Sequence, residues 1–141
     1  MRKRTFFILT LLVLYFASEP TPVYKGCEFL HRITFHFYHS NIWHLLANAS
    51  CIYAIRKFRW LESFIVASIC SWVVVYPTVG VSGMVFAAIG LNLGNNGNWK
   101  GLLKCSLSAV VFGLMPGVSM LFHLVCLVVG FLFIYSWRKL K

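Results

Sequence analysis

The sequence predicts an all-α membrane protein, a bundle of six transmembrane helices with a short central fourth helix. Hydrophobic residues make up 60% of the 141-residue chain and charged residues only 11%, whereas a soluble domain has about 25% charged residues. Apolar runs recur along the chain, and six spans of about 20 residues would occupy roughly 120 residues, which leaves no room for a soluble domain. We therefore expect a single membrane domain over residues 1–141, with spans at 5–22, 40–55, 61–77, 82–94, 101–115 and 119–137.

The basic residues predict how the spans are oriented. The net charge of +10 comes from 13 basic and 3 acidic residues. Eleven of the basic residues lie at the ends of the chain or in alternate connections: Arg2, Lys3, Arg4, Arg56, Lys57, Arg59, Lys100, Lys104, Arg138, Lys139 and Lys141. The other two, Lys25 and Arg32, lie in the remaining connections. This positive-inside asymmetry places both termini in the cytoplasm and requires an even number of spans, and it makes the lipid bilayer rather than a nucleic acid the expected partner.

The first apolar run has two interpretations. A basic start, an apolar stretch and the sequence Ala17-Ser18-Glu19 are also typical of a secretory signal peptide. We favour a retained span over 5–22, because an even number of spans requires it. Residues 18–39 then form an outer loop in which aromatic residues alternate with histidine and arginine, a mixture that suits the membrane–water interface.

The second and third spans differ in character. His44 and Asn48 are four residues apart in the second span and so share one helix face. They either join two spans by a hydrogen bond or belong to a functional site. The third span looks structural and ends at Pro77.

The fourth span is too short to cross a bilayer. Residues 82–94 span roughly 20 Å as a helix, against a hydrocarbon core of about 30 Å. A run rich in asparagine, residues 92–98, fixes its inner end, so Ser82 should lie roughly 10 Å below the outer surface. Irregular backbone over 77–81 is tolerated at that depth only inside protein or beside water. We therefore expect an aqueous pocket with Ser82 at its floor.

The last three spans contain small residues and one histidine. Gly83, Ala87 and Gly90 give the fourth span a small-residue face for close packing. The fifth span has few features and ends before Pro116-Gly117. In the sixth span, His123 lies near the outer end at a depth close to that of Ser82, with Gly130 two turns further on.

The polar groups inside the predicted bundle are Ser82, His123, His44 and Asn48, with no carboxylate among them. Aspartyl chemistry needs a carboxylate pair, and a zinc protease of the common kind needs H-E-x-x-H, so both are excluded. No metal site and no cofactor is expected, because His36, His39 and His44 lack an acidic partner and helical spacing. The five cysteines form no C-x-x-C pair and are read as packing residues. Ser82 is then either a helix cap or a nucleophile with a histidine base.

Three separated motifs resemble the rhomboid family of intramembrane serine proteases. His39-x4-His44-x3-Asn48 is similar to the family's second-span motif and Gly80-Val81-Ser82-Gly83 to its G-x-S-G nucleophile motif. His123 followed by Gly130 is similar to its sixth-span motif, and the pattern Arg32, Thr34, Phe37 resembles its first loop. The resemblance covers nearly the whole chain as a minimal bacterial-type core.

The resemblance implies a role for each matched residue. Ser82 would be the nucleophile and His123 the general base and then acid. His44, Asn48 and the Ser82 backbone N–H would bind the oxyanion. His39 would support the loop, with Gly80 and Gly83 flanking the nucleophile, and the ring of Phe86 would stack under His123.

The chain departs from the family pattern at three positions. Phe86 stands where many members have tyrosine, Phe122 where a small residue precedes the histidine, and Cys126 where a glycine follows it. The last two predict a wider approach between the fourth and sixth spans.

The resemblance implies a serine endopeptidase that cleaves single-span membrane proteins near their outer end. The alternative is a catalytically inactive relative that binds or escorts membrane segments. A small transporter or channel would need polar sites across the full bilayer, and the inner half of the chain offers few. The short chain, without an organelle signal, favours a bacterial inner membrane.

Overall fold

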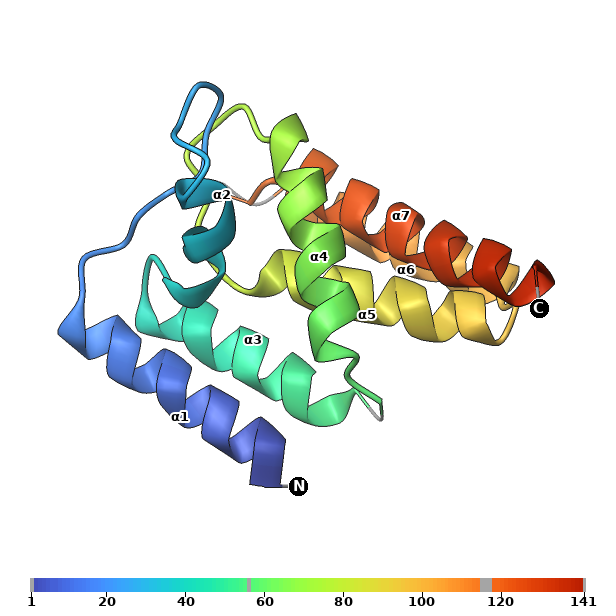
Figure 1. The fold of residues 1–141 in the computed structure, drawn as a ribbon, viewed down its shortest axis with the longest axis horizontal. Helices are drawn as coiled ribbons and strands as arrows, with labels where there is room; N and C mark the ends of the chain where they lie inside the picture. Colours follow the sequence, from blue (N-terminus) through green and yellow to red (C-terminus); the bar gives the residue numbers. More distant parts are fainter. Residues whose placement is uncertain (1, 56, 115–117, 141) are drawn as a thin grey trace.

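The computed structural model describes residues 2–55, 57–114 and 118–140. Over these residues the regular elements are all helices (Figure 1). The one β-type pairing among them is an isolated antiparallel bridge between Val23 and Thr78. The elements in order are α1 (Arg2–Ala17), α2 (His31–Thr34), the 3-10 turn η1 (Phe35–Phe37), α3 (Ile42–Ala54), α4 (Trp60–Cys70), the 3-10 turn η2 (Ser71–Val73), α5 (Ser82–Asn95), α6 (Trp99–Gly113) and α7 (Met120–Lys139). The predicted all-α class is confirmed.

The six long helices follow the six predicted segments, with two clear differences at their ends. Helix α1 ends at Ala17 rather than near residue 22, because Pro20 and Pro22 follow and have no backbone N–H to continue the helix. The Ser18 hydroxyl also donates to the Leu14 carbonyl at 2.8 Å. Regular structure after α4 ends at Val73 rather than at Pro77, where the Ser71 hydroxyl bonds the Ser68 carbonyl at 2.6 Å. Residue 115, Pro116 and Gly117, at the predicted end of the fifth span, lie outside the described residues, as do Arg56 and Lys141.

Side-chain caps fix the start of two helices. The Asn41 side chain accepts the His44 N–H at 2.8 Å at the start of α3, and the Asn98 side chain accepts the Gly101 N–H at 2.8 Å at the start of α6. Each cap satisfies a donor that has no partner inside its helix.

Helix length alone does not establish six membrane crossings. Among the described residues, α7 is the one helix both long and apolar enough to cross a bilayer, with 20 residues. Helix α5 has 14 residues, which at 1.5 Å per residue gives about 21 Å. The short central helix is therefore present, while six crossings stay a prediction.

The outer faces of several helices are apolar stripes. Exposed large side chains recur at helical spacing on α1 (Phe6, Leu9, Val13, Phe16), from α4 into η2 (Leu61, Ile65, Ile69, Trp72) and along and just after α6 (Leu103, Leu107, Val111, Leu114). A helix in water presents its polar side to solvent, and large contiguous exposed apolar patches mark membrane or protein contact surfaces. The outer surface of this bundle therefore suits lipid.

Helices α5 and α7 pack more closely than large side chains allow. A Cβ built on Gly90 would meet the carbonyl of Leu127, and one built on Gly130 would lie 2.6 Å from the carbonyl of Ala87. A Cβ on Gly83 would meet the Phe122 ring. The small face formed by Gly83, Ala87 and Gly90 therefore faces α7, which confirms the predicted close packing.

Replacing Gly90 by alanine is expected to destabilise the fold, because the new methyl meets the Leu127 carbonyl of the backbone, and overpacking of this kind costs about 1–3 kcal/mol. The gain in helix propensity of about 1 kcal/mol offsets part of this cost, so the expected net loss is up to about 2 kcal/mol. The measurement is thermal or denaturant unfolding in detergent. Gly101→Ala in α6 is the comparison, since the three atoms nearest its Cβ would belong to the Asn98 and Leu93 side chains, which can shift more easily than backbone. Asn98 also caps α6, so a loss of up to about 1 kcal/mol is expected there. Equal stability of the two variants would contradict the prediction.

The loop of residues 18–39 is exposed in part, but several of its side chains are buried in the bundle. Phe35 and His36 are fully buried, and Arg32 is nearly so. The Arg32 guanidinium donates to the carbonyls of Ser71 at 2.8 Å and Tyr24 at 3.3 Å and lies 4.1 Å from the centre of the Trp72 ring. The predicted interfacial loop is therefore anchored to the end of α4.

Replacing Arg32 by alanine is expected to cost about 1.5–3 kcal/mol, the usual worth of hydrogen bonds to a charged group. Arg32→Lys should recover only part of this stability, because an ammonium cannot reproduce the planar fork that reaches two carbonyls. Unfolding of the two variants in the same detergent measures the difference. Full recovery by lysine would mean that charge alone matters at this position.

Candidate active site

Ser82 is the first residue of α5, and its hydroxyl does not cap that helix. The residue before it, Val81, occupies the cap position without a side-chain hydrogen bond. The first backbone N–H groups of a helix have no partner within it and favour negative charge. The structure therefore does not support Ser82 as the helix cap, and it places the hydroxyl beside donors that suit an anion.

The irregular segment before Ser82 is held by backbone hydrogen bonds. Val23 and Thr78 exchange two bonds of 2.9 Å, and the Gly80 N–H donates to the Phe35 carbonyl at 2.9 Å. Gly80 has φ +116°, a backbone conformation that residues with a side chain rarely adopt. A Cβ there would also lie 2.7 Å from the His44 ring. The predicted irregular backbone is present, and the protein itself satisfies part of it.

Ser82 and His123 come together from separate helices. The Ser82 Oγ lies 2.8 Å from the His123 Nε2, a buried hydrogen bond between α5 and α7. Each residue is 7% exposed. The chain has only three carboxylates, and the one in a helix of the bundle, Glu62, pairs with Arg59 at 3.4 Å. The arrangement is thus a serine and histidine pair without a carboxylate.

The aromatic ring of Phe86 stacks on the imidazole of His123. Their ring centres are 4.7 Å apart and the planes are inclined by 21°. Phe86 is one turn after Ser82 on the same helix, so α5 supplies both the hydroxyl and the surface under the imidazole. This contact limits the orientations available to His123.

The two departures around His123 do not separate α5 from α7. Phe122 is fully buried and lies over Gly83, where the absence of a side chain leaves room for its ring. Cys126 is fully buried and belongs to the same buried cluster as Cys70 of α4. The prediction of a wider approach is therefore wrong, because these side chains fill space at a glycine and at α4. Both cysteines are free.

His44 and Asn48 converge on Gly80 from α3. A Cβ on Gly80 would lie 3.1 Å from the His44 Nε2 and 3.6 Å from the Asn48 Nδ2. The Asn48 Nδ2 is buried and has no hydrogen-bond partner among the described residues. An unpaired buried donor is costly, and in a native structure it calls for an explanation, of which a catalytic role is one. Two side-chain donors thus lie close to the backbone just before Ser82.

His36 and His39 are neutral supports in the loop before α3. Burial lowers the pKa of His36 to about 3, and its Nε2 lies 3.1 Å from the Ser68 hydroxyl. Burial, and secondly the nearby His44, lowers the pKa of His39 to about 4. The His39 ring meets the His44 ring edge-on at 5.2 Å. Among the described residues, no three side chains form a cluster suited to a metal ion.

The sequence predicts an aqueous pocket with Ser82 at its floor, but in the structure Ser82 and His123 are largely covered. A cavity of about 170 Å³ flanks the site, lined by Tyr76, Pro77, Thr78, Val118 and Ser119. This cavity adjoins the site through Ser119, whose carbonyl accepts the His123 backbone N–H at 3.1 Å. With Ser82 and His123 each 7% exposed, a polypeptide reaches them only if covering groups move.

The motifs do not identify two residues that shape the site. Phe35 accepts the Gly80 N–H through its carbonyl and packs 5.8 Å from Phe122, between ring centres. Ser119 accepts the His123 N–H. Both act through backbone carbonyls, which any residue type provides, so residue identity gives no direct signal of them. The apolar phenylalanine inside a polar loop is the one clue available for Phe35.

The chain is similar to a known protein over most of its length. The chain is 28% identical, over an alignment of 157 residues, to "Putative rhomboid protein L523" of Acanthamoeba polyphaga mimivirus, and the alignment covers 95% of this chain and 90% of that protein. This similarity supports a relationship to rhomboid-like proteins. The chain matches no protein-family model and no solved structure.

Proposed function

We propose that this chain is a rhomboid-type intramembrane serine endopeptidase with Ser82 as nucleophile and His123 as general base. The observation that carries the proposal is the 2.8 Å hydrogen bond between the Ser82 Oγ and the His123 Nε2. A serine hydroxyl is a weak nucleophile until a positioned base accepts its proton, and this distance allows that transfer. The similarity to a rhomboid-like protein over most of the chain supports the same function.

In the proposed reaction, the Ser82 Oγ attacks the carbonyl carbon of a peptide bond while the His123 Nε2 takes the hydroxyl proton. The carbonyl oxygen becomes an oxyanion. His123 then gives its proton to the leaving amine, the C–N bond breaks, and an acyl-enzyme forms. Water, deprotonated by His123, hydrolyses the ester and restores the hydroxyl.

The oxyanion would be bound where three donors meet. Within the described ranges the Asn48 Nδ2 is buried without a hydrogen-bond partner. The His44 ring lies beside Gly80, and the Ser82 N–H belongs to the first turn of α5. Each such donor contributes about 10²–10³ in rate in a site with little water. His123 is held for its role by the Phe86 ring.

The substrates in this proposal are single-span membrane proteins, cut near their outer end. A transmembrane helix hides its own carbonyls, so the cleaved segment must unwind locally. Cleavage is expected at small residues beside helix-destabilising ones. A reporter span carrying Ala, Ser, Gly or Pro at that depth tests this preference, and indifference to these residues would contradict it.

We place the chain in a membrane with both termini on the cytoplasmic side. The apolar outer stripes of α1, α4 and α6 support a lipid surrounding. In Figure 1 both ends of the chain lie away from α2 and from the segment before α5. The similar protein is viral, so the bacterial inner membrane stays a prediction from the sequence.

A serine-reactive fluorophosphonate probe tests the proposal directly. We expect the probe to label the purified protein in detergent, and Ser82→Ala to abolish labelling. Ser106→Ala, which removes a half-buried hydroxyl on α6, should be labelled like the wild type. In-gel fluorescence of the three proteins at equal loading is the measurement.

The same experiment separates the enzyme from an inactive rhomboid-like protein that binds membrane segments. Ser82 and His123 are largely covered, as a binding protein without catalysis would allow. A folded wild type that the probe does not label would favour this second function. Equal labelling of wild type and Ser82→Ala would place the reactive hydroxyl elsewhere.

A further inference from the structure

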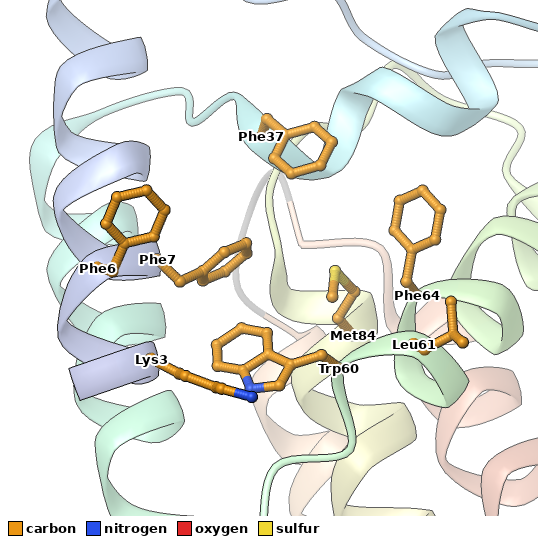
Figure 2. A pocket seen from close by; sticks show the side chains of 8 residues that line it. All are labelled: Lys3, Phe6, Phe7, Phe37, Trp60, Leu61, Phe64 and Met84. Carbon is orange, nitrogen blue, oxygen red and sulfur yellow. The ribbon is translucent and has the colours of Figure 1, made fainter. Parts of the chain in front are cut away.

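An apolar groove lies between residues of α1 and α4, beside η1 and α5. It has a volume of about 470 Å³, within the roughly 300–1,000 Å³ of ligand pockets. Figure 2 shows it lined from α1, η1, α4 and α5 by Lys3, Phe6, Phe7, Phe37, Trp60, Leu61, Phe64 and Met84. The groove takes no part in the chemistry proposed for Ser82.

The lining residues of α1 lie on one face of that helix. Lys3, Phe6 and Phe7 have the spacing i, i+3 and i+4 and therefore share one face of α1. The floor forms where Phe7 packs on Trp60, with ring centres 4.4 Å apart. Phe6 and Leu61 remain exposed at the rim, so the groove is open along its length to the surroundings of the bundle.

One charged group lies among the apolar lining residues. Lys3 lies at one end of the groove and Phe37 at the other (Figure 2). Arg59, the residue before Trp60, already pairs with Glu62 at 3.4 Å. The groove thus combines apolar walls with a single cationic end, and it belongs to the strongly basic side of the chain.

We propose that this groove binds a phospholipid with an anionic headgroup, one acyl chain along the apolar walls and the phosphate at Lys3. A long apolar channel with one cation matches a molecule that has an apolar chain and one negative end. Basic pockets between transmembrane helices on the cytoplasmic side bind such headgroups. The inference rests on the membrane location within the proposed function and is independent of the Ser82 chemistry.

Charge favours a lipid over another transmembrane helix as the occupant. Neighbouring spans carry their own lysines and arginines at the cytoplasmic end, and a second copy of this chain would bring the same basic residues. Such groups would meet Lys3 as like charges. An anionic headgroup pairs with it instead.

Native mass spectrometry of the delipidated full chain tests the proposal. The protein is mixed in detergent with equal amounts of phosphatidylglycerol and phosphatidylcholine of the same acyl chains. We expect the wild type to retain phosphatidylglycerol about fivefold more than phosphatidylcholine, the effect of roughly 1 kcal/mol per basic residue near anionic lipid. Lys3→Gln should abolish this preference. Lys100→Gln, at an exposed position in the first turn of α6, should keep it.

A second pair of variants tests the acyl-chain site. Leu61→Trp fills the groove and should reduce retention of both lipids, whereas Leu103→Trp, equally exposed on α6, should not. Equal loss in Lys3→Gln and Lys100→Gln, or wild-type retention by Leu61→Trp, would overturn the proposal. Lipid-free dimers that depend on Leu61 would assign the groove to a second copy and also overturn it. Fluorophosphonate labelling of the same samples reports the enzyme separately, so the two proposals fail independently.

Discussion

His123→Ala is expected to lower the rate of cleavage of a reporter span by roughly 10⁴-fold, the upper range for a general base. In the structure this imidazole is 2.8 Å from the Ser82 hydroxyl, and among the described residues no carboxylate is hydrogen-bonded to it. The substitution removes the group that accepts the serine proton and later protonates the leaving amine. Cleavage by purified protein in liposomes, at saturating substrate, measures the loss.

The double variant separates a reacting pair from two independent positions. If Ser82 and His123 act in the same step, Ser82→Ala combined with His123→Ala should be no slower than either single variant. Multiplied losses would show that the two residues contribute separately and would contradict the proposed mechanism. Phe86→Tyr is the matched control, because it keeps the ring that stacks on His123 and should retain activity.

Asn48→Ala is expected to lower kcat by about 10²–10³, the cost of removing one oxyanion donor, with little change in KM. The loss appears in kcat because the oxyanion exists only after the hydroxyl attacks. The Asn48 Nδ2 is buried and has no hydrogen-bond partner in the described part of the chain, so it is available to an oxyanion that forms during the reaction. Steady-state kinetics on the reporter span give both constants.

Stability distinguishes this role from a structural one. Removing a buried donor that has no partner costs the folded state no hydrogen bond, so Asn48→Ala should unfold at or above the wild-type temperature. If Asn48 instead joined two helices, the variant would unfold earlier. Asn96→Ala, at an exposed position after α5, controls for loss of an amide elsewhere and should leave both kcat and unfolding unchanged.

The helices were predictable because hydrophobic runs and chain-breaking residues mark them. The apolar runs located all six long helices, and the start of α5 at Ser82 follows from the irregular stretch between Pro77 and Gly80. Their ends were less predictable. The hydroxyls of Ser18 and Ser71 donate to carbonyls of their own helices near the observed ends. The predicted ends rest on the length of the apolar runs, which carries no information about such local hydrogen bonds.

The long-range features of the site depended on information that hydropathy lacks. That Ser82 and His123 meet is suggested by motif resemblance and similar depth, but the burial of Arg32 and Phe35 depends on packing of a loop with mixed polarity. The large ring of Phe122 fits between α5 and α7 because Gly83, which it covers, has no side chain. Considered without Gly83, Phe122 predicts a wider separation of the two helices, which is the opposite of what the structure has.

The paired hydrogen bonds between Val23 and Thr78 have a consequence for how substitutions at a distance should behave. They connect the segment that follows α1 to the segment before α5, which leads to Ser82. Because these bonds join the first connection directly to the stretch before Ser82, we expect a displacement at Val23 to reach the reacting hydroxyl without passing through a helix. Both bonds are made by backbone groups, so Val23→Pro, which removes the donated N–H, should lower turnover even where the amount of folded protein is unchanged.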